Sequence, residues 1–303
     1  MANNLRKFNT SADYSAATLV YPAVSYVAQS DNVMFDKTAP TPPPTPHDYS
    51  QDYFTIRVIE DIDIVWAGAP LSYSIDGGTT WSEPSSDITL SAVTSGSTVM
   101  FKGGIASGPI GKFDTGGAGK FEVEGNIMSL LYGDNFVGQT VLPIGDAFAN
   151  MFTLGKTIKT YNLISAENLV LPATTLNGDC YRAMFQGCAA LVTPPKILPA
   201  TTLTKSNYGC YNSMFANCTS LTTAPELPAT TLADSCYSMM FKGCTSLNSI
   251  TCLATDISAT GCTSSWVNGV AASGTFTKAA SMSSWTSGTS GIPSGWTVAD
   301  YAE

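Results

Sequence analysis

Thiol chemistry is the first possibility that this sequence raises. All eight cysteines lie between Cys180 and Cys262, and most of them form pairs with the spacing Cys-x7-Cys. Cysteines form disulfides in oxidising compartments and bind zinc as thiolates. This is not a zinc spacing, and the one histidine, His47, is far away in a proline-rich stretch. We therefore favour a ladder of small buried side chains, because free cysteine is among the most buried residue types.

Catalysis would need titratable side chains that converge on one site. The one histidine, His47, lies in the predicted linker, so neither a histidine-based triad nor a His-ligated zinc site can be assembled. Aspartate and glutamate are scattered over residues 1–150, and no pair stands out as the acid and base of a glycosidase. The sequence predicts a protein that is not an enzyme, with no catalytic residue, cofactor or metal.

One motif with a defined local chemistry lies at residues 74–81, Ser-Ile-Asp-Gly-Gly-Thr-Thr-Trp. It matches the Asp-box pattern S-x-D-x-G-x-T-W and resembles repeats of sialidase-type propellers. In such a hairpin the aspartate accepts hydrogen bonds from the turn and the tryptophan fills the core. We interpret Asp76 and Trp81 as structural, since one copy does not make a propeller.

Three near-copies of one segment define the elements that must position these side chains. Each copy begins with Leu-Pro-Ala-Thr-Thr-Leu, at Leu171, Leu198 and Leu227, and continues a few residues later with Cys-Tyr-x-x-Met-Phe-x-x-Cys. Equivalent phenylalanines are 30 and then 26 residues apart. A period in this range is typical of a solenoid, whose stacked units share one core.

Within each copy the cysteines, tyrosine, methionine and phenylalanine share one face of a helix with 3.6 residues per turn. Asp179 and Asp234 stand where N-caps are wanted, and Gly187 and Gly243 where a helix would end. The expected short helices cover residues 179–187, 208–217 and 234–243. The Leu-Pro block would supply a short, imperfect strand.

Composition and pattern divide the chain into five parts and predict an α+β fold. Residues 1–38 form an N-terminal anchor with a β-hairpin, and the proline-rich residues 39–49 form an extended linker. Residues 50–124 alternate apolar and polar side chains, which predicts an all-β sandwich-like domain. About five coils of solenoid follow over residues 125–270. Residues 271–303 would cap the last apolar face.

The charge balance argues against several classes of function. The chain is 44% hydrophobic and 12% charged, with a net charge of −9. An acidic chain does not attract phosphate backbones, so nucleic-acid binding is not expected. No apolar segment follows Arg6 and Lys7 as in a secretory leader, so either the protein is not exported by the common route or its leader has been removed. No run approaches the ~20 apolar residues of a membrane span. We expect assembly in a reducing cytoplasm and no membrane insertion.

The repeat resembles the BspA-like subgroup of leucine-rich repeats, which are common in Bacteroidetes surface proteins and in phages that infect them. The matching residues are the Leu-Pro arm, the Met-Phe pair and Cys-Thr-Ser-Leu at residues 218–221 and 244–247. The resemblance covers roughly residues 125–298. It implies a leucine-rich-repeat solenoid, and it brings no catalytic residues.

The opening segment is similar to the N-terminus of virion proteins from crAss-like Bacteroides phages. The similarity rests on Asn-Asn-Leu-Arg-Lys-Phe at residues 3–8, Tyr-Ser-Ala-Ala-Thr-Leu at 14–19 and Tyr-Pro-Ala-Val-Ser at 21–25. It implies a protein of the virion surface, assembled in the bacterial host cytoplasm, that binds capsid proteins through residues 1–38 and self-associates, as a homotrimer. The candidate capsid-docking residues are Leu5, Arg6, Phe8, Tyr14, Leu19, Tyr21, Tyr26 and Phe35.

Together these resemblances imply a phage head fibre or capsid decoration protein that displays its repeats for host-surface or mucosal attachment, to a glycan or a protein. The alternative is a bacterial surface adhesin or glycan-binding module on the bacterial cell surface. Its candidate ligand contacts are Trp266, Trp285 and Trp296, which could stack on sugars. The same three residues could instead fill the last coil and the cap, and we favour that second interpretation.

Overall fold

The computed structural model describes residues 26–29, 32–35, 46–104, 108–117, 119–153, 162–204 and 208–302. The chain divides into two compact units, Met1–His47 and Asp48–Glu303. In the first unit, β1 (Tyr26–Gln29) and β2 (Asn32–Phe35) pair antiparallel, where the sequence predicts a hairpin.

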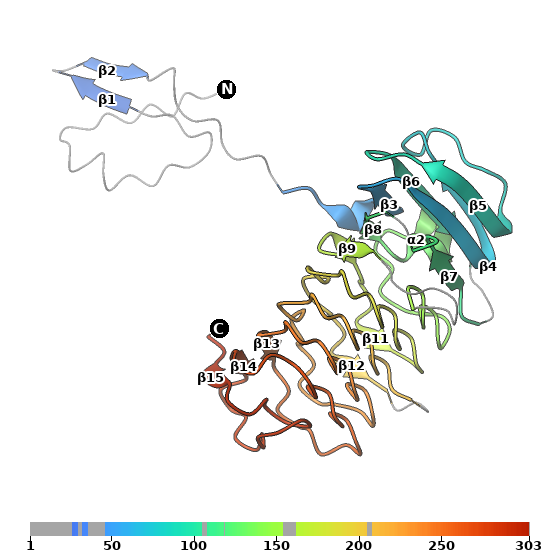
Figure 1. The fold of residues 1–303 in the computed structure, drawn as a ribbon. Coiled ribbons are helices and arrows are strands. Elements are labelled where there is room, and N and C mark those ends of the chain that lie inside the picture. The colour runs from blue at the N-terminus through green and yellow to red at the C-terminus, as the bar shows by residue number, and fades with distance from the viewer. Residues whose placement is uncertain are drawn as a thin grey trace. The chain divides into compact units, whose positions relative to one another are not determined.

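The second unit begins with a mixed eight-stranded sheet in the order β10-β8-β3-β6-β4-β5, with β7 added to β4 and β9 to β8 (Figure 1). Its strands are β3 (Phe54–Val58), β4 (Ile62–Ser74), β5 (Ser85–Val93), β6 (Thr98–Gly103), β7 (Gly111–Asp114), β8 (Phe121–Asn126), β9 (Leu163–Ser165) and β10 (Leu169–Val170). Short helical turns precede β3 and follow β8, namely η1 (Tyr49–Gln51), α2 (Ser129–Tyr132) and η2 (Gly133–Asn135).

Strand β4 is long because it pairs with different neighbours along its length. Its first half pairs with β5 and β7, and its second half pairs with β6. The pairing register shifts between Ala67 and Leu71. Gly68 lies in that interval, where a side chain would collide with the backbone of Ile110 and Gly111. The structure therefore has one irregular mixed sheet in place of the predicted sandwich-like domain.

Strand β8 belongs to both the sheet and the solenoid. It pairs antiparallel with β3, and on its other edge it pairs parallel with β9 and β10. Two further backbone bonds join the sheet region to the first coil, from the N–H of Ile110 to the carbonyl of Ala147 and from Phe113 to Met151, each 3.1 Å. The sheet therefore serves as the surface on which the first coil is built.

The remainder of the unit is a β-solenoid of about five turns, as the repeats predict. Parallel pairs link its coils, in β11 (Thr175–Leu176) with β12 (Thr202–Leu203) and in a final sheet in the order β13-β14-β15. That sheet is formed by β13 (Ser249–Cys252), β14 (Thr275–Lys278) and β15 (Thr297–Asp300). The region expected to be a cap thus adds two more parallel strands to the stack.

The predicted helices over residues 179–187, 208–217 and 234–243 are wrong, because these segments are runs of turns. Ala183, Ser213 and Met239 have positive φ angles of 53°, 56° and 53°, which an α-helix does not contain. In these turn segments the apolar side chains face the core at nearly the same sequence spacing as on one face of a helix. The apolar pattern alone therefore could not distinguish a helix from such a run of turns.

Backbone hydrogen bonds explain why turns replace helices. In residues 181–188, every second backbone N–H donates to the carbonyl of the residue three positions earlier in the same coil, as Arg182 does to Asp179. The intervening N–H groups leave the coil, with N···O distances of 2.8–3.0 Å. These bonds run from Tyr181 to Cys210, from Ala183 to Asn212, from Phe185 to Met214 and from Gly187 to Ala216. The following coils repeat the pattern.

Two stacks of aromatic rings fill the solenoid core. One contains Phe113, Phe152, Phe185, Phe215 and Phe241, with successive ring centroids 5.3–6.0 Å apart. The other contains Phe148, Tyr181, Tyr211 and Tyr237, with successive centroids 5.6–6.0 Å apart. Both stacks reach Trp266, 6.2 Å from Phe241 and from Tyr237. The hydrophobic core is therefore continuous from the sheet to the last coils.

Truncating the middle of the first stack should destabilise the whole second unit. Phe215 is fully buried between Phe185 and Phe241. We expect Phe215→Ala to lower the free energy of unfolding by roughly 3–5 kcal/mol, because it removes buried apolar contacts and leaves a cavity. Urea unfolding of the full chain measures this change. The control Thr222→Ala alters an exposed residue and should change stability little; equal losses in both variants would contradict the shared core.

Candidate functional site

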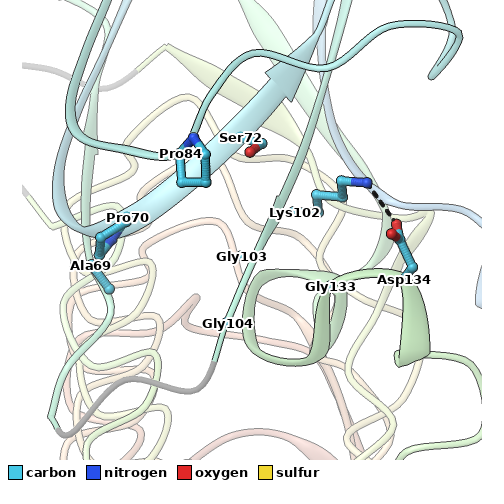
Figure 2. A pocket seen from close by; sticks show the side chains of 9 residues that line it. All are labelled: Ala69, Pro70, Ser72, Pro84, Lys102, Gly103, Gly104, Gly133 and Asp134. Atoms are coloured by element: carbon cyan, nitrogen blue, oxygen red, sulfur yellow. Dashed lines mark hydrogen bonds and ion pairs between the residues drawn. The ribbon is translucent and has the colours of Figure 1, made fainter.

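A pocket of about 510 Å³ opens on the sheet where β4 and β6 lie beside the turn after α2 (Figure 2). Its lining combines apolar side chains, glycine backbone and three polar side chains. The lining residues are Ala69, Pro70, Ser72, Pro84, Lys102, Gly103, Gly104, Gly133 and Asp134. The volume lies within the range of about 300–1,000 Å³ that is usual for small-molecule sites.

Lys102 and Asp134 form an ion pair at the pocket (Figure 2), with 2.7 Å between Nζ and Oδ1. Their side chains are 20% and 63% exposed. The Tyr53 hydroxyl donates to the same Oδ1 at 2.7 Å. The lysine and then the tyrosine lower the pKa of Asp134, whereas burial and the nearby carboxylate raise the pKa of Tyr53 to about 12. The ion pair thus places a positive and a negative group side by side at the pocket.

Aromatic rings hold this charged pair in place. The Lys102 Nζ lies 4.3 Å from the centroid of the Trp81 ring, within the range of cation–π attraction. Tyr53 meets Trp81 edge-on with centroids 4.9 Å apart and packs against Phe136 at 5.0 Å. The half-buried tryptophan of the Asp-box hairpin therefore supports a pocket residue as well as the sheet.

Ser72 contributes a hydroxyl to the pocket. The residue is 8% exposed, and its hydroxyl has no hydrogen-bond partner among the described residues. In the pairing of β4 with β6, Ser72 lies directly opposite Lys102, so both side chains stand on the same face of the sheet. Gly103 beside them has no room for a side chain, since a Cβ would lie 2.5 Å from Leu71 Cδ2 and 2.6 Å from the Leu130 carbonyl oxygen.

The Asp-box hairpin has the hydrogen bonds that its sequence predicts. Asp76 accepts on Oδ1 from the Thr80 N–H at 2.9 Å and from the Ser74 hydroxyl at 2.7 Å, and on Oδ2 from the Thr80 hydroxyl at 2.7 Å. The indole N–H of Trp81 donates to the carbonyl of Gly78 at 3.1 Å. These bonds, that of the Thr80 backbone first, lower the pKa of Asp76 to about 2.

The tryptophans proposed as ligand contacts lie in the last coils. Trp266 is fully buried, its ring stacks 5.6 Å from that of Trp285, and its indole N–H donates to the Gly291 carbonyl at 2.8 Å. Trp296 is 7% exposed and donates to the Ala271 carbonyl at 2.8 Å. Trp285 is half-buried. Trp266 and Trp296 thus lie in the hydrophobic core of the last coils.

The proposed capsid-docking side chains lie outside the described residues. For Tyr26 and Phe35 only the backbone is described, where they are paired partners in the hairpin. The other six, from Leu5 to Tyr21, fall in the part of the chain that the structure does not describe. Their proposed role stays a prediction.

All eight cysteines are free and buried. The Sγ atoms of Cys218 and Cys244 donate to the carbonyls of Phe185 and Phe215 in the preceding coils, at 3.1 and 3.0 Å. Burial raises the pKa of Cys210 to about 11 and that of Cys180 to about 12. Among the described residues, no group of three or more His, Cys, Asp or Glu side chains could hold a metal ion.

A column of hydroxyls follows one outer edge of the solenoid. It consists of exposed threonines at successive positions along the stack, namely Thr140, Thr174, Thr201, Thr230 and Thr255. Backbone bonds join Thr174 to Thr140 at 3.2 Å, Thr201 to Thr174 at 3.1 Å and Thr255 to Thr230 at 2.8 Å. The threonines of the Leu-Pro blocks therefore lie toward the surface, while the flanking leucines are largely buried.

In the part of the chain that the structure describes, no helix has the length and apolar character needed to cross a membrane.

No protein-family model, curated protein or solved structure matches the chain. The fold itself defines it as a mixed β-sheet domain followed by a β-solenoid of about five turns, with almost no helix.

The carboxyl group of Asp76 should titrate well below its ordinary pKa of 3.8, with a midpoint near 2. Because the folded-state value is the lower one, its contribution to stability is present above about pH 4 and is lost as the pH falls toward 2. Carboxyl ¹³C chemical shifts measured against pH test this. Thr80→Val should raise the midpoint, and Thr79→Val, which removes a hydroxyl bonded to the Asp76 carbonyl, should not. A midpoint near 3.8 in the unaltered protein would refute the assignment.

The buried thiols should be unreactive until the protein unfolds. A thiol reacts as its thiolate, and burial raises the thiol pKa of Cys180, Cys210, Cys244 and Cys252 to about 11 or 12. We expect Ellman's reagent to detect no thiol in the native protein at pH 8, and eight after denaturation without reductant. Fewer than eight in the denatured sample, against a reduced control, would mean that disulfides are present.

Proposed function

We propose that this chain is a non-enzymatic virion structural protein, a head fibre or capsid decoration, whose solenoid is a relative of the BspA-like leucine-rich repeats. The observation that supports this role is the unbroken set of hydrogen bonds and core contacts from the sheet to the last coil. Coils joined in this way form a stiff body, which suits the display of a surface away from an attachment point. The proposal also rests on the resemblances of the repeat and of the opening segment.

In this proposal residues 1–38 bind capsid proteins, and the proline-rich residues 39–49 space the second unit from them. The division of the chain after His47 supports such an arrangement. The protein would reach the virion surface after assembly in the bacterial cytoplasm, where thiols stay reduced. It would self-associate, as a trimer, and carry its second unit toward a host-surface or mucosal ligand.

The state of the buried groups also favours a structural role for the solenoid. The tyrosines of the core stack are fully enclosed, and burial raises the pKa of Tyr181, Tyr211 and Tyr237 well above the ordinary value. Groups of this kind neither donate nor accept protons near neutral pH. The repeated polar residues of the core therefore serve packing.

A bacterial surface adhesin or glycan-binding module is the second candidate. The pocket beside Trp81 favours it, because a concave site with three polar side chains is a feature of ligand binding that a purely structural protein does not need. The two candidates differ in where the protein resides, and particle composition distinguishes them.

Removal of residues 1–38 should prevent incorporation into particles and leave the second unit folded. Mass spectrometry of purified particles, assembled with the full chain or with the truncated one, measures loading. Circular dichroism and thermal melting show whether the truncated protein keeps its fold, and Thr222→Ala in the full chain serves as the loading control. Normal loading of the truncated protein would refute the anchor, and absence of the full chain from particles would favour the adhesin.

A further inference from the structure

We propose that the pocket between β4, β6 and the turn after α2 binds one residue of a neutral saccharide. This inference deepens the proposed function by naming the ligand class that the displayed unit would contact, and it rests on that function for its biological setting only. The binding chemistry is carried by Ser72, Lys102 and Asp134.

The charges of the pocket select for an uncharged ligand. Lys102 and Asp134 lie 2.7 Å apart and neutralise each other, so the site has no net attraction for an anion or a cation. Each still has hydrogen-bonding capacity. An ammonium group has three donors, of which one is used on Asp134, and both bonds to Asp134 fall on Oδ1. A ligand hydroxyl can therefore accept from Lys102 and donate to the Asp134 Oδ2.

Ser72 supplies the second observation that points to a ligand. Ser72 is 8% exposed as a residue, its hydroxyl has no partner among the described residues, and it lines the pocket between Pro84 and Lys102 in the view of Figure 2. A hydroxyl in the wall of a pocket that makes no bond to the protein is available to a ligand. Because a hydroxyl both donates and accepts, a second ligand hydroxyl would satisfy it, and the opposed positions of Ser72 and Lys102 place the two contacts side by side.

The remaining walls suit the carbon face of a sugar ring. Ala69, Pro70 and Pro84 offer apolar surface (Figure 2), and the glycine backbone at Gly104 has open space around it. The polar groups are held before a ligand arrives, since Lys102 is fixed by the Trp81 ring and by Asp134. Preorganised groups lose less freedom on binding, so an array of this kind can bind a small polar molecule.

Saturation-transfer NMR on the full chain tests the proposal, with the methyl glycosides of glucose, galactose, mannose and N-acetylglucosamine as probes. We expect transfer to at least one glycoside, and weakening of its binding by about tenfold in Lys102→Met and in Ser72→Ala, because each removes a hydrogen bond in the pocket. Lys102→Met keeps the side-chain stem against Trp81. The matched control Lys112→Met alters an exposed lysine of the same sheet and should bind as the unaltered protein does.

Melting temperatures confirm that each variant is folded before binding is compared. The proposal is overturned if none of the four glycosides shows transfer, if binding is unchanged in both pocket variants, or if inorganic phosphate or glycine binds the pocket in their place. Because the measurement uses isolated protein, a negative result would refute saccharide binding and would not bear on the virion role. If the protein binds a glycoside but is missing from purified particles, the virion role is refuted and saccharide binding is not.

Discussion

A single coil of this solenoid cannot satisfy its own backbone. In the turn segments, half of the N–H groups bond within the coil, and the other half reach a carbonyl only on the next coil, as from Tyr181 to Cys210. Buried backbone groups without partners are strongly unfavourable. Each coil therefore requires its neighbour, and the stack requires a surface that completes the first one. The sheet provides this surface through β8 and through the bonds from Ile110 and Phe113.

This dependence joins the two halves of the second unit in one core and also provides the scaffold for the pocket. Phe113 of the sheet stacks on Phe152 of the first coil, with ring centroids 6.0 Å apart. The pocket residues Ser72 and Lys102 stand on β4 and β6, strands that are paired to each other within the same sheet. A site built on paired strands keeps its geometry better than one built on loops alone.

Several features could be predicted from the sequence because they depend on local pattern. The repeat gives the solenoid and the burial of its Cys, Tyr, Met and Phe side chains, and the Asp-box gives the bonds to Asp76. The sequence wrongly predicted helices in the repeats, because the positive φ angles that interrupt them fall at Ala183 and Ser213. Glycine is the usual sequence signal of such a backbone conformation, and neither position has one. The pocket could not be found either. Ser72 and Lys102 meet through strand register across 30 residues, and the local signal, a lysine followed by two glycines at a strand end, is weak.

The near-identity of the coil interfaces bears on how such a chain changes over generations. In each repeat the Cys-Tyr-x-x-Met-Phe-x-x-Cys segment presents similar turns and the same aromatic rings to the coil on either side, so the middle coils resemble one another at both faces. Unequal recombination between two such repeats would insert or delete one whole coil and leave both ends of the stack intact. The length of the rod can therefore evolve in steps of a single repeat, independently of the sheet that carries the pocket.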